Sequence, residues 1–306
     1  MTSPQLKAQL DTFISYLELE RRVSFHTTKN YRLDLERLAL HCQAQGIVAW
    51  RQLDAKAIRS FVTVLHRQGL SGRSIQRSLS AVRSFFRYLI REGLASINPG
   101  DKMSAPKSAK RLPKALTVDQ MTSLLESDLK PDGLQQRDQA MLELVYSSGL
   151  RLAELIGLDI YDMDLEQGLV RVTGKGAKTR VVPVGAAAER ALSSWLLKRP
   201  DIALPEEQAL FVSLRGTRIH PRTVQQRVAK WAERKGLEQP LHPHMLRHSF
   251  ASHLLESSGN LRAVQELLGH TDISTTQIYT HLDFQHLAAI YDKSHPRARK
   301  KKNRRV

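Results

Sequence analysis

Apolar residues recur every three or four positions through most of the N-terminal third of the chain, and this spacing predicts helices that pack through one face. Four such segments fall within residues 3–93. The third opens at Asp54 and stops at Gly69, and the fourth runs from Ser71 to Gly93. Because no alternating strand pattern interrupts them, we expect a small helical bundle.

The second half of the chain combines helices with one pair of strands. Helical spacing returns near Thr117 and again over residues 186–236, where Trp195 and Trp231 are expected in the core. Residues 168–184 instead carry a strand pattern on both sides of a Gly-Lys-Gly turn, which predicts a β-hairpin with lysines at its tip. The chain is therefore expected to be mainly α with a small β-hairpin or sheet, in which an α+β domain follows the helical bundle.

Residues 242–281 have the pattern of three short helices separated by stops at Gly259 and Gly269. The first helix has an apolar core face of Leu246, Phe250 and Leu254. The polar residues at or near the helix ends are His244, Arg247, His270 and Tyr279. Helix ends of this kind can bring polar side chains together at one place.

A proline-containing basic stretch separates the two halves. Pro99, Pro106 and Pro113 interrupt any helix there, and several lysines accompany them. We therefore expect a helical N-terminal domain over residues 1–94, a basic linker over 95–116, a second domain over 117–292 and a basic tail over 293–306. A basic linker between two basic domains favours a C-shaped clamp that closes around DNA, and the alternative is an ordinary exposed tether.

The charge of the chain indicates a polyanionic partner. Its 47 lysines and arginines exceed its 30 acidic residues, for a net charge of +17 and a pI near 10.2. Nucleic acid is the first candidate for such a partner. No apolar run reaches the length that spans a membrane, so we expect no membrane partner. The N-terminus lacks the pattern of a signal peptide and Cys42 is the only cysteine, which favours a cytoplasmic location.

The fourth predicted helix carries a row of arginines at helical spacing. These are Arg73, Arg77, Arg83, Arg87 and Arg91, and no acidic residue lies between the first and the last of them. We expect them to contact DNA phosphates, which would give affinity but little sequence information. The alternative is a solvated helix face.

A metal site is not expected. His244 and His248 have the spacing of a zinc-binding helix, but Met245 stands where such a motif has its catalytic glutamate. We expect His248 and His253 to be buried or half-buried histidines that make a hydrogen bond.

Two arginines, two histidines, a lysine and a tyrosine suit transesterification at a phosphodiester without a metal. Guanidinium groups can fork onto two phosphate oxygens and offset the charge that builds up in the transition state. A tyrosine is a weak nucleophile at its free pKa of about 10, and neighbouring cations favour its phenolate. A lysine on a hairpin can give a proton to the leaving oxygen.

Five short motifs, in order, resemble those of the tyrosine recombinases, the phage-integrase-like family. They are Gly-Leu-Arg151-Leu-Ala-Glu154-Leu, Gly-Lys175-Gly, His244-x-x-Arg247-His, Leu-Leu-Gly-His270 and Tyr279. Each motif alone is weak, whereas together they are specific, and the resemblance spans nearly the whole chain, with a SAM-like N-terminal domain.

The resemblance implies a role for each of these side chains. Tyr279 would be the nucleophile that forms a 3′-phosphotyrosyl link, and Arg151 and Arg247 would bind the non-bridging oxygens of the phosphate. His244 and His270 would hydrogen-bond the phosphate or move protons, and Lys175 would protonate the leaving 5′ oxygen. The family uses no metal and no nucleotide cofactor.

The residues around Tyr279 are similar, within this family, to those of the bacterial Xer recombinases. That resemblance implies a heterotetramer with the paralogue XerD on a chromosomal site called dif, where chromosome dimers are resolved under the control of the FtsK translocase. It also implies that residues 284–291 dock onto a neighbouring subunit.

Three other interpretations remain open at this point. A mobile-element or phage integrase would use the same chemistry on a different target. A DNA-binding protein without activity would use Tyr279 only for packing, and would form no covalent complex with DNA. A topoisomerase-like relaxase would act without a preferred sequence.

Overall fold

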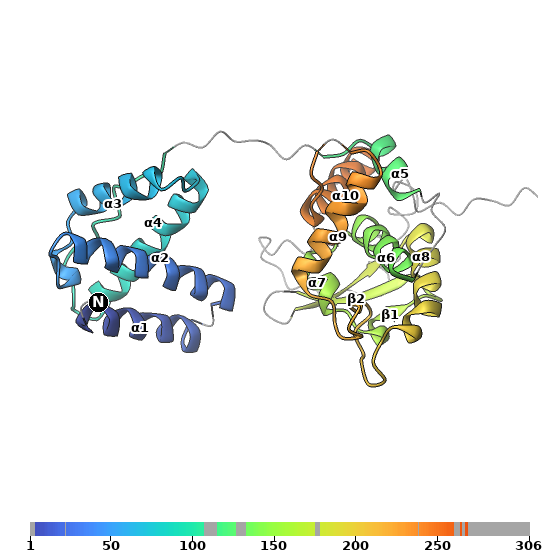
Figure 1. The fold of residues 1–306 in the computed structure, drawn as a ribbon, viewed down its shortest axis with the longest axis horizontal. Helices are drawn as coiled ribbons and strands as arrows, with labels where there is room; N and C mark the ends of the chain where they lie inside the picture. The colour runs from blue at the N-terminus through green and yellow to red at the C-terminus, as the bar shows by residue number, and fades with distance from the viewer. Residues whose placement is uncertain are drawn as a thin grey trace, which may run out of the picture. The chain divides into compact units, whose positions relative to one another are not determined.

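The computed structural model describes residues 4–21, 23–106, 115–126, 133–174, 178–237 and 239–259, together with Val264, Leu267 and Leu268. The chain divides into two compact units, residues 1–111 and 112–306 (Figure 1). The fold is mainly helical with one small sheet, as predicted. The predicted clamp concerns the placement of the two units, and it stays a prediction.

The first unit is a helical bundle, which confirms the prediction for this half of the chain. Its helices are α1 (Pro4–Leu19), α2 (Phe25–Ala44), α3 (Ala55–Arg67) and α4 (Gly72–Arg91), with a 3-10 turn, η1, at Trp50–Gln52. Asp54 and Ser71 cap α3 and α4 by accepting a hydrogen bond from the backbone amide three residues later. The two predicted helix starts are therefore confirmed.

Aromatic side chains fill the core of the first unit. Phe13 and Phe85 are fully buried with ring centroids 5.1 Å apart, and Trp50 meets Phe85 edge to face at 5.0 Å. The buried Trp50 Nε1 donates to the carbonyl oxygen of Leu6 at 3.1 Å, so the turn between α2 and α3 is tied to α1.

The start of the predicted linker is attached to the first unit. Arg83 of α4 donates from Nε to the carbonyl oxygen of Gly100 at 3.0 Å and from Nη2 to that of Met103. Met103 and Ala105 pack against the core of the same unit. Residues 95–106 therefore differ from the ordinary exposed tether that stood as the alternative, because these backbone carbonyl groups find a donor on α4.

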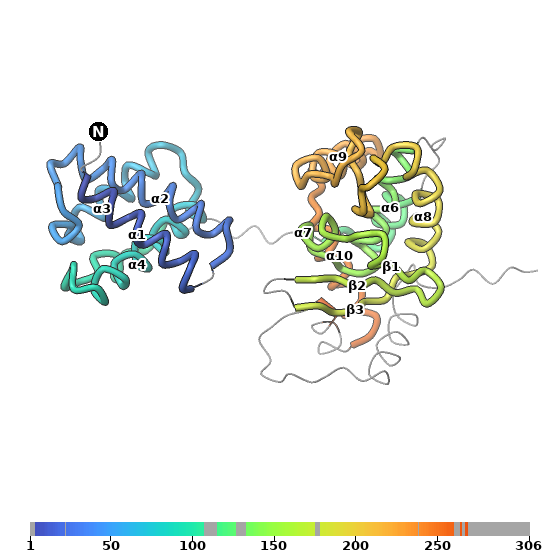
Figure 2. Tube along the Cα trace, turned by 90° about the horizontal axis from the view of Figure 1, so that it is seen from below, coloured from blue at the N-terminus to red at the C-terminus, as the bar shows by residue number. Residues whose placement is uncertain are grey.

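The second unit is built around α6 (Gly133–Ser148), which is covered by helices on several sides (Figures 1 and 2). Its other elements are α5 (Val118–Leu125), α7 (Leu152–Gly157), η2 (Ile160–Asp162), β1 (Met163–Asp164), β2 (Leu169–Thr173), β3 (Thr179–Pro183), α8 (Ala186–Lys198), η3 (Arg199–Asp201), α9 (Pro221–Arg234) and α10 (Pro243–Ser258). Trp195 and Trp231 are both buried, as predicted.

The sheet is antiparallel in the order β1-β2-β3 (Figure 2). Val170 pairs with Val182, and both are buried, whereas Arg171 pairs with Val181 on the exposed face. The hairpin strands are therefore confirmed. The tip at residues 175–177 lies outside the described residues. Strand β1 was not predicted, because two residues are too few to show an alternating pattern.

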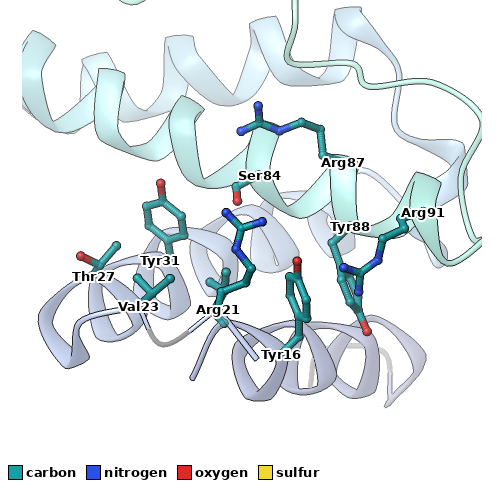
Figure 3. Close-up of a pocket in the computed structure, with 10 residues that line it drawn as sticks. Tyr16, Arg21, Val23, Thr27, Tyr31, Ser84, Arg87, Tyr88 and Arg91 are labelled. Carbon is teal, nitrogen blue, oxygen red and sulfur yellow. The ribbon is translucent and has the colours of Figure 1, made fainter. Parts of the chain in front are cut away.

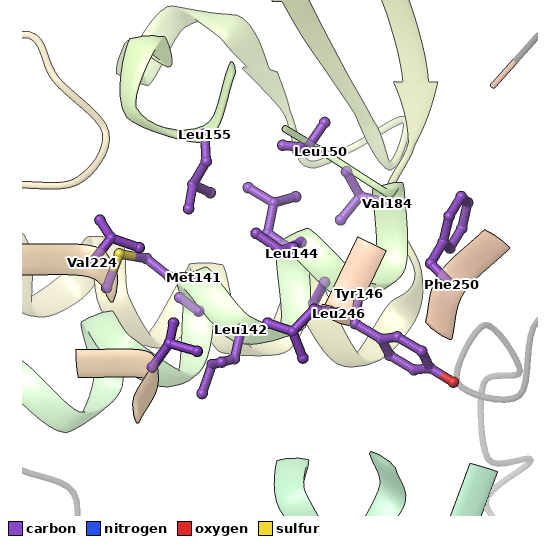
Figure 4. Packing of buried hydrophobic residues seen from close by; sticks show 14 of the residues in the cluster. Met141, Leu142, Leu144, Tyr146, Leu150, Leu155, Val184, Val224, Leu246 and Phe250 are labelled. Carbon is purple, nitrogen blue, oxygen red and sulfur yellow. The ribbon is translucent and has the colours of Figure 1, made fainter. Parts of the chain in front are cut away.

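Helix α10 presents one face to the core and another away from it. Leu246, Phe250 and Leu254 are buried as predicted, and Figure 4 shows Leu246 and Phe250 beside α6. His253 is buried and lies 2.9 Å from the Tyr146 hydroxyl, which confirms that prediction, and burial lowers its pKa. The prediction for His248 is wrong, since it is exposed: it lies two residues from Leu246, about 200° around the helix.

Candidate active site

The site begins at a glycine turn that joins α6 to α7. Gly149 has φ +61°, which favours glycine, and a Cβ atom on it would lie 2.4 Å from Cδ1 of Phe250. The predicted helix stop at Gly149 and helix start at Arg151 are therefore confirmed. Leu150 and Leu155 are buried on either side of α7's first turn and anchor it to the core (Figure 4).

Glu154 is a buried carboxylate that holds Arg151. Its side chain is 2% exposed. Its Oε2 accepts from the backbone N–H of Arg151 and its Oε1 from Nη1 of Arg151, both at 2.8 Å. Burial raises the pKa of Glu154, but the hydrogen bonds from Arg180 and Arg151 outweigh it, so the net pKa lies below its ordinary value. Glu154 is therefore ionised and fixed.

A second arginine reaches the same carboxylate from the sheet. Arg180 of β3 donates from Nη1 to Oε1 of Glu154 at 2.8 Å and from Nη2 to Oε2 at 3.1 Å. Sequence reasoning missed this residue. The available signal was its position, because in the alternation of the strand it shares a face with the buried Val182.

Arg247 of α10 completes the cluster. Its guanidinium donates to the carbonyl oxygens of Gly149 and Leu268, the latter at 2.8 Å, and Nη1 lies 4.0 Å from Oε2 of Glu154. Desolvation lowers the pKa of Arg247 to about 10, and the like charges of Arg151 and Arg180 add to this effect. Among the residues that the structure describes, the site thus holds three cations and one carboxylate, a balance that favours an incoming anion.

The other predicted catalytic residues relate to this cluster in different ways. His244 is exposed on α10, three residues before Arg247, and so lies on the neighbouring turn. Gly174, just before Lys175, comes close: a Cβ on it would be 3.3 Å from Oε1 of Glu154. Leu268, two residues before His270, is held by Arg247. Three predicted residues lie outside the described residues, namely Lys175, His270 and Tyr279.

The cluster is suited to binding a phosphate group. Guanidinium groups form charge-assisted hydrogen bonds with phosphate oxygens, and a half-buried position strengthens them. Arg151 is 37% exposed and Arg247 is 12% exposed, so one lies nearer the surface than the other. Within the ranges that the structure describes, no group of three or more histidine, cysteine, aspartate and glutamate residues could hold a metal ion.

Four of the five arginines predicted as a row on α4 divide into two kinds, and the fifth, Arg91, pairs with Glu92. Arg77 forms a fork with the buried carboxylate of Asp34 on α2, at 2.8 and 3.2 Å, and Arg83 binds the chain after α4. The sequence contains no acid near Arg77 on its own helix, so this pairing was not foreseen. Arg73 and Arg87 are exposed and have no carboxylate or carbonyl partner in the described part of the chain.

Arg87 borders a hollow of about 470 Å³ where α1, α2 and α4 meet (Figure 3). The Arg21 guanidinium lies between the rings of Tyr16 and Tyr31 in this view. Arg91 lies over the Tyr16 ring, 4.1 Å from its centroid. The lining residues are Tyr16, Leu17, Arg21, Val23, Thr27, Tyr31, Ser84, Arg87, Tyr88 and Arg91. Cations and hydroxyl groups together suit a phosphate oxygen.

Comparisons with known proteins agree with the two units. Residues 114–286 match the model of the phage integrase family, and residues 10–93 match that of the phage integrase N-terminal SAM-like domain. The chain is 54% identical to tyrosine recombinase XerC of Pseudomonas aeruginosa, over 97% of this chain and 98% of that protein. It is 55% identical to tyrosine recombinase XerC of Azotobacter vinelandii, over 97% and 99%.

Solved structures share the fold. The XerH site-specific recombinase bound to a palindromic difH substrate, in a post-cleavage complex, has a TM-score of 0.70 at 23% identity, over 95% of this chain and 91% of that one. A lambda integrase dimer bound to a COC′ core site has a TM-score of 0.67 at 19% identity, over 90% and 99%. None of the helices in the described ranges is long and apolar enough to cross a membrane.

Proposed function

Because the chain belongs to the phage integrase family as a tyrosine recombinase, a DNA strand transferase of site-specific recombination, we propose how its residues carry out the reaction. The earlier alternatives of a DNA-binding protein without activity and of a relaxase without a preferred sequence are therefore set aside. The observation that carries the proposal is the cluster of Arg151, Arg180 and Arg247 around Glu154.

The cluster binds the phosphate at which the strand is cut. Arg151 and Arg247 donate to its non-bridging oxygens and offset the charge that grows there as the reaction proceeds. Two features support this assignment: the described residues of the cluster carry more positive than negative charge, and burial lowers the pKa of Arg247 to about 10, so an anion that binds there would stabilise its cation.

Transfer then exchanges one ester for another. The Tyr279 oxygen bonds to phosphorus as the bond from phosphorus to the 5′ oxygen breaks, which leaves a 3′-phosphotyrosyl ester. Lys175 gives its proton to the departing 5′ oxygen, while His244 and His270 hydrogen-bond the phosphate or move protons. Attack by a 5′ hydroxyl of another strand reverses these steps and releases Tyr279. Because the ester conserves the bond, rejoining requires neither ATP nor a metal.

The first unit holds the DNA duplex through its phosphates. Arg73 and Arg87 are exposed, and the hollow beside Arg87 adds Arg21 and several hydroxyl groups. Arg77 and Arg83 serve mainly to hold α4 in place through Asp34 and the chain after α4. These contacts give affinity and register, and base recognition requires others.

We propose the biological setting from the resemblance to the Xer recombinases. We place the protein in the cytoplasm, acting with a XerD paralogue as a heterotetramer on a dif-like site of double-stranded DNA, where it resolves chromosome dimers under the control of the FtsK translocase. Support comes from the XerC relatives at 54–55% identity over nearly the whole chain. Docking of residues 284–291, which lie outside the described residues, onto a neighbouring subunit belongs to the same proposal.

Covalent trapping tests the nucleophile. A duplex with a dif-like site and a nick beside the scissile phosphate lets the short cleaved fragment diffuse away, so that the ester accumulates. The wild type, with its paralogue added, is expected to give a slowly migrating protein–DNA band on a denaturing gel, and Tyr279→Phe is expected to give none.

Tyr161→Phe is the matched control, because this tyrosine of the same unit is 80% exposed on η2 and makes no contact with the cluster in the described hydrogen bonds and ion pairs. It should trap DNA as well as the wild type. A band that persists in Tyr279→Phe would remove Tyr279 from its role. The absence of any band from the wild type would contradict the proposed chemistry on that site.

A further inference from the structure

Arg180 is fully engaged within the protein. Its Nη1 and Nη2 donate to the two oxygens of Glu154, and its Nε donates to the carbonyl oxygen of Leu267 at 3.3 Å. Its side chain is 15% exposed. All three of its nitrogens thus have partners, so Arg180 is not placed to be a third ligand of the substrate phosphate.

Arg247 lies near the same carboxylate but does not form a hydrogen bond with it. Its Nη1 is 4.0 Å from Oε2 of Glu154, beyond hydrogen-bond distance, whereas Arg180 reaches that oxygen at 3.1 Å. Arg247 instead donates to the carbonyl oxygens of Gly149 and Leu268. A carboxylate that paired directly with Arg247, as it already does with Arg151, would reduce the positive charge that the two guanidinium groups offer to the phosphate. The two hydrogen bonds from Arg180 hold Glu154 in place and so prevent it from pairing directly with Arg247.

We propose that Arg180 is a positioning residue that holds Glu154 away from Arg247 and so keeps Arg247 available to the scissile phosphate. This inference rests on the proposed function. Without Arg180, Glu154 retains its bond to Arg151, and among the described residues Arg247 is the next cation that it can reach. The carboxylate then turns toward Arg247, and the cluster has also lost the positive charge of Arg180 itself.

The test is the single-turnover rate of covalent cleavage on the nicked duplex. Arg180→Met is expected to lower this rate by about 10- to 100-fold, the usual effect of losing a residue that orients a ligand-binding group. DNA affinity should change by less than about 3-fold, because the other phosphate contacts remain. Arg180→Lys keeps the positive charge but not the two-pronged hydrogen bonding, so its cleavage rate should lie between those of the wild type and Arg180→Met.

A second substitution separates this role from general support of the fold. If Glu154 turns onto Arg247 when Arg180 is lost, then removing its charge releases Arg247. The double variant Arg180→Met, Glu154→Gln should therefore cleave at least about 3-fold faster than Arg180→Met alone, a non-additive effect between contacting residues. A residue that only supported the fold would give a double variant as slow as, or slower than, the single one.

Arg171→Met is the matched control, since Arg171 is exposed on the opposite face of the neighbouring strand. It should cleave at the wild-type rate. The inference fails if Arg180→Met cleaves like the wild type, or if the Glu154→Gln change does not restore cleavage. Failure of the proposed function itself is distinguishable, because the wild type would then form no covalent complex.

Discussion

At the scale of single residues, the candidate site depends on Gly149, a position where no side chain fits. Gly149 combines a positive φ with contact against Phe250, and its own carbonyl oxygen accepts from Arg247. The glycine therefore links the geometry of the turn to that of the guanidinium. A change here acts on the fold and on the candidate phosphate site together.

Gly149→Ala is expected to lower the free energy of unfolding by ~2 kcal/mol or more, since the left-handed conformation alone costs ~1–2 kcal/mol for an L-residue and the methyl group also meets Phe250. Chemical denaturation measures this change. Gly157→Ala is the control, because Gly157 has an ordinary φ and nothing within 4 Å of its would-be Cβ. Equal stability of the two variants would contradict the steric argument.

At the scale of elements, one buried carboxylate joins two helices of the first unit. Asp34 of α2 is fully buried and receives both Arg77 of α4 and Arg37 of its own helix, the latter at 3.4 Å. Arg77 is 41% exposed, so solvent weakens its side of the pair. The hydrogen bonds to the buried carboxylate nevertheless fix the position of α4 against α2.

Asp34→Ala should therefore destabilise the first unit by ~2 kcal/mol, in the range measured for hydrogen bonds to charged groups. Amide hydrogen exchange of peptides from α2 and α4 measures it. Asp11→Ala provides the comparison, because Asp11 pairs with Arg32 while both are about two-fifths exposed, and such pairs contribute ~0–1 kcal/mol. Similar protection from exchange in the two variants would show that the buried Asp34 pair contributes no more to stability than the exposed Asp11 pair.

The helices and strands also show which features of the fold could be predicted from the sequence and which could not. The bundle helices and the hairpin were predictable, because periodicity and caps such as Asp54 and Ser71 are local signals. Local signals could not show that Asp34 pairs with Arg77, or that Arg180 reaches Glu154, since each pair joins segments distant along the chain. The proposed catalytic residues were inferred from motifs, and of these the structure describes Arg151, His244 and Arg247.

At the scale of the whole molecule, a net charge of +17 dominates the interaction with DNA. Each phosphate contact releases counterions from the duplex, so affinity falls steeply with salt. The arginines of the first unit are not equal in this respect. Those engaged by Asp34 or by backbone carbonyl groups have less to offer DNA than Arg21 and Arg87, which border the open hollow.

Arg87→Gln and Arg21→Gln should each reduce the slope of log affinity against log salt by about 1, the effect of one lost phosphate contact. Fluorescence anisotropy with a labelled duplex across a salt series measures the slope. Arg190→Gln on α8 has the same effect on net charge and lies outside the hollow, so it should leave the slope unchanged. If all three variants behaved alike, the hollow would have no particular role.

The buried charge of Arg247 also bears on how this protein can evolve. The lowered pKa of Arg247 means that burial makes its charged form less stable in the folded protein than in water. A neutral side chain of similar shape would remove that burial cost, but it would also lose the hydrogen bonds that Arg247 donates to the carbonyl oxygens of Gly149 and Leu268. The burial cost and the two hydrogen bonds act in opposite directions on stability, so under the proposed function it is phosphate binding, rather than stability, that selects for an arginine at this position.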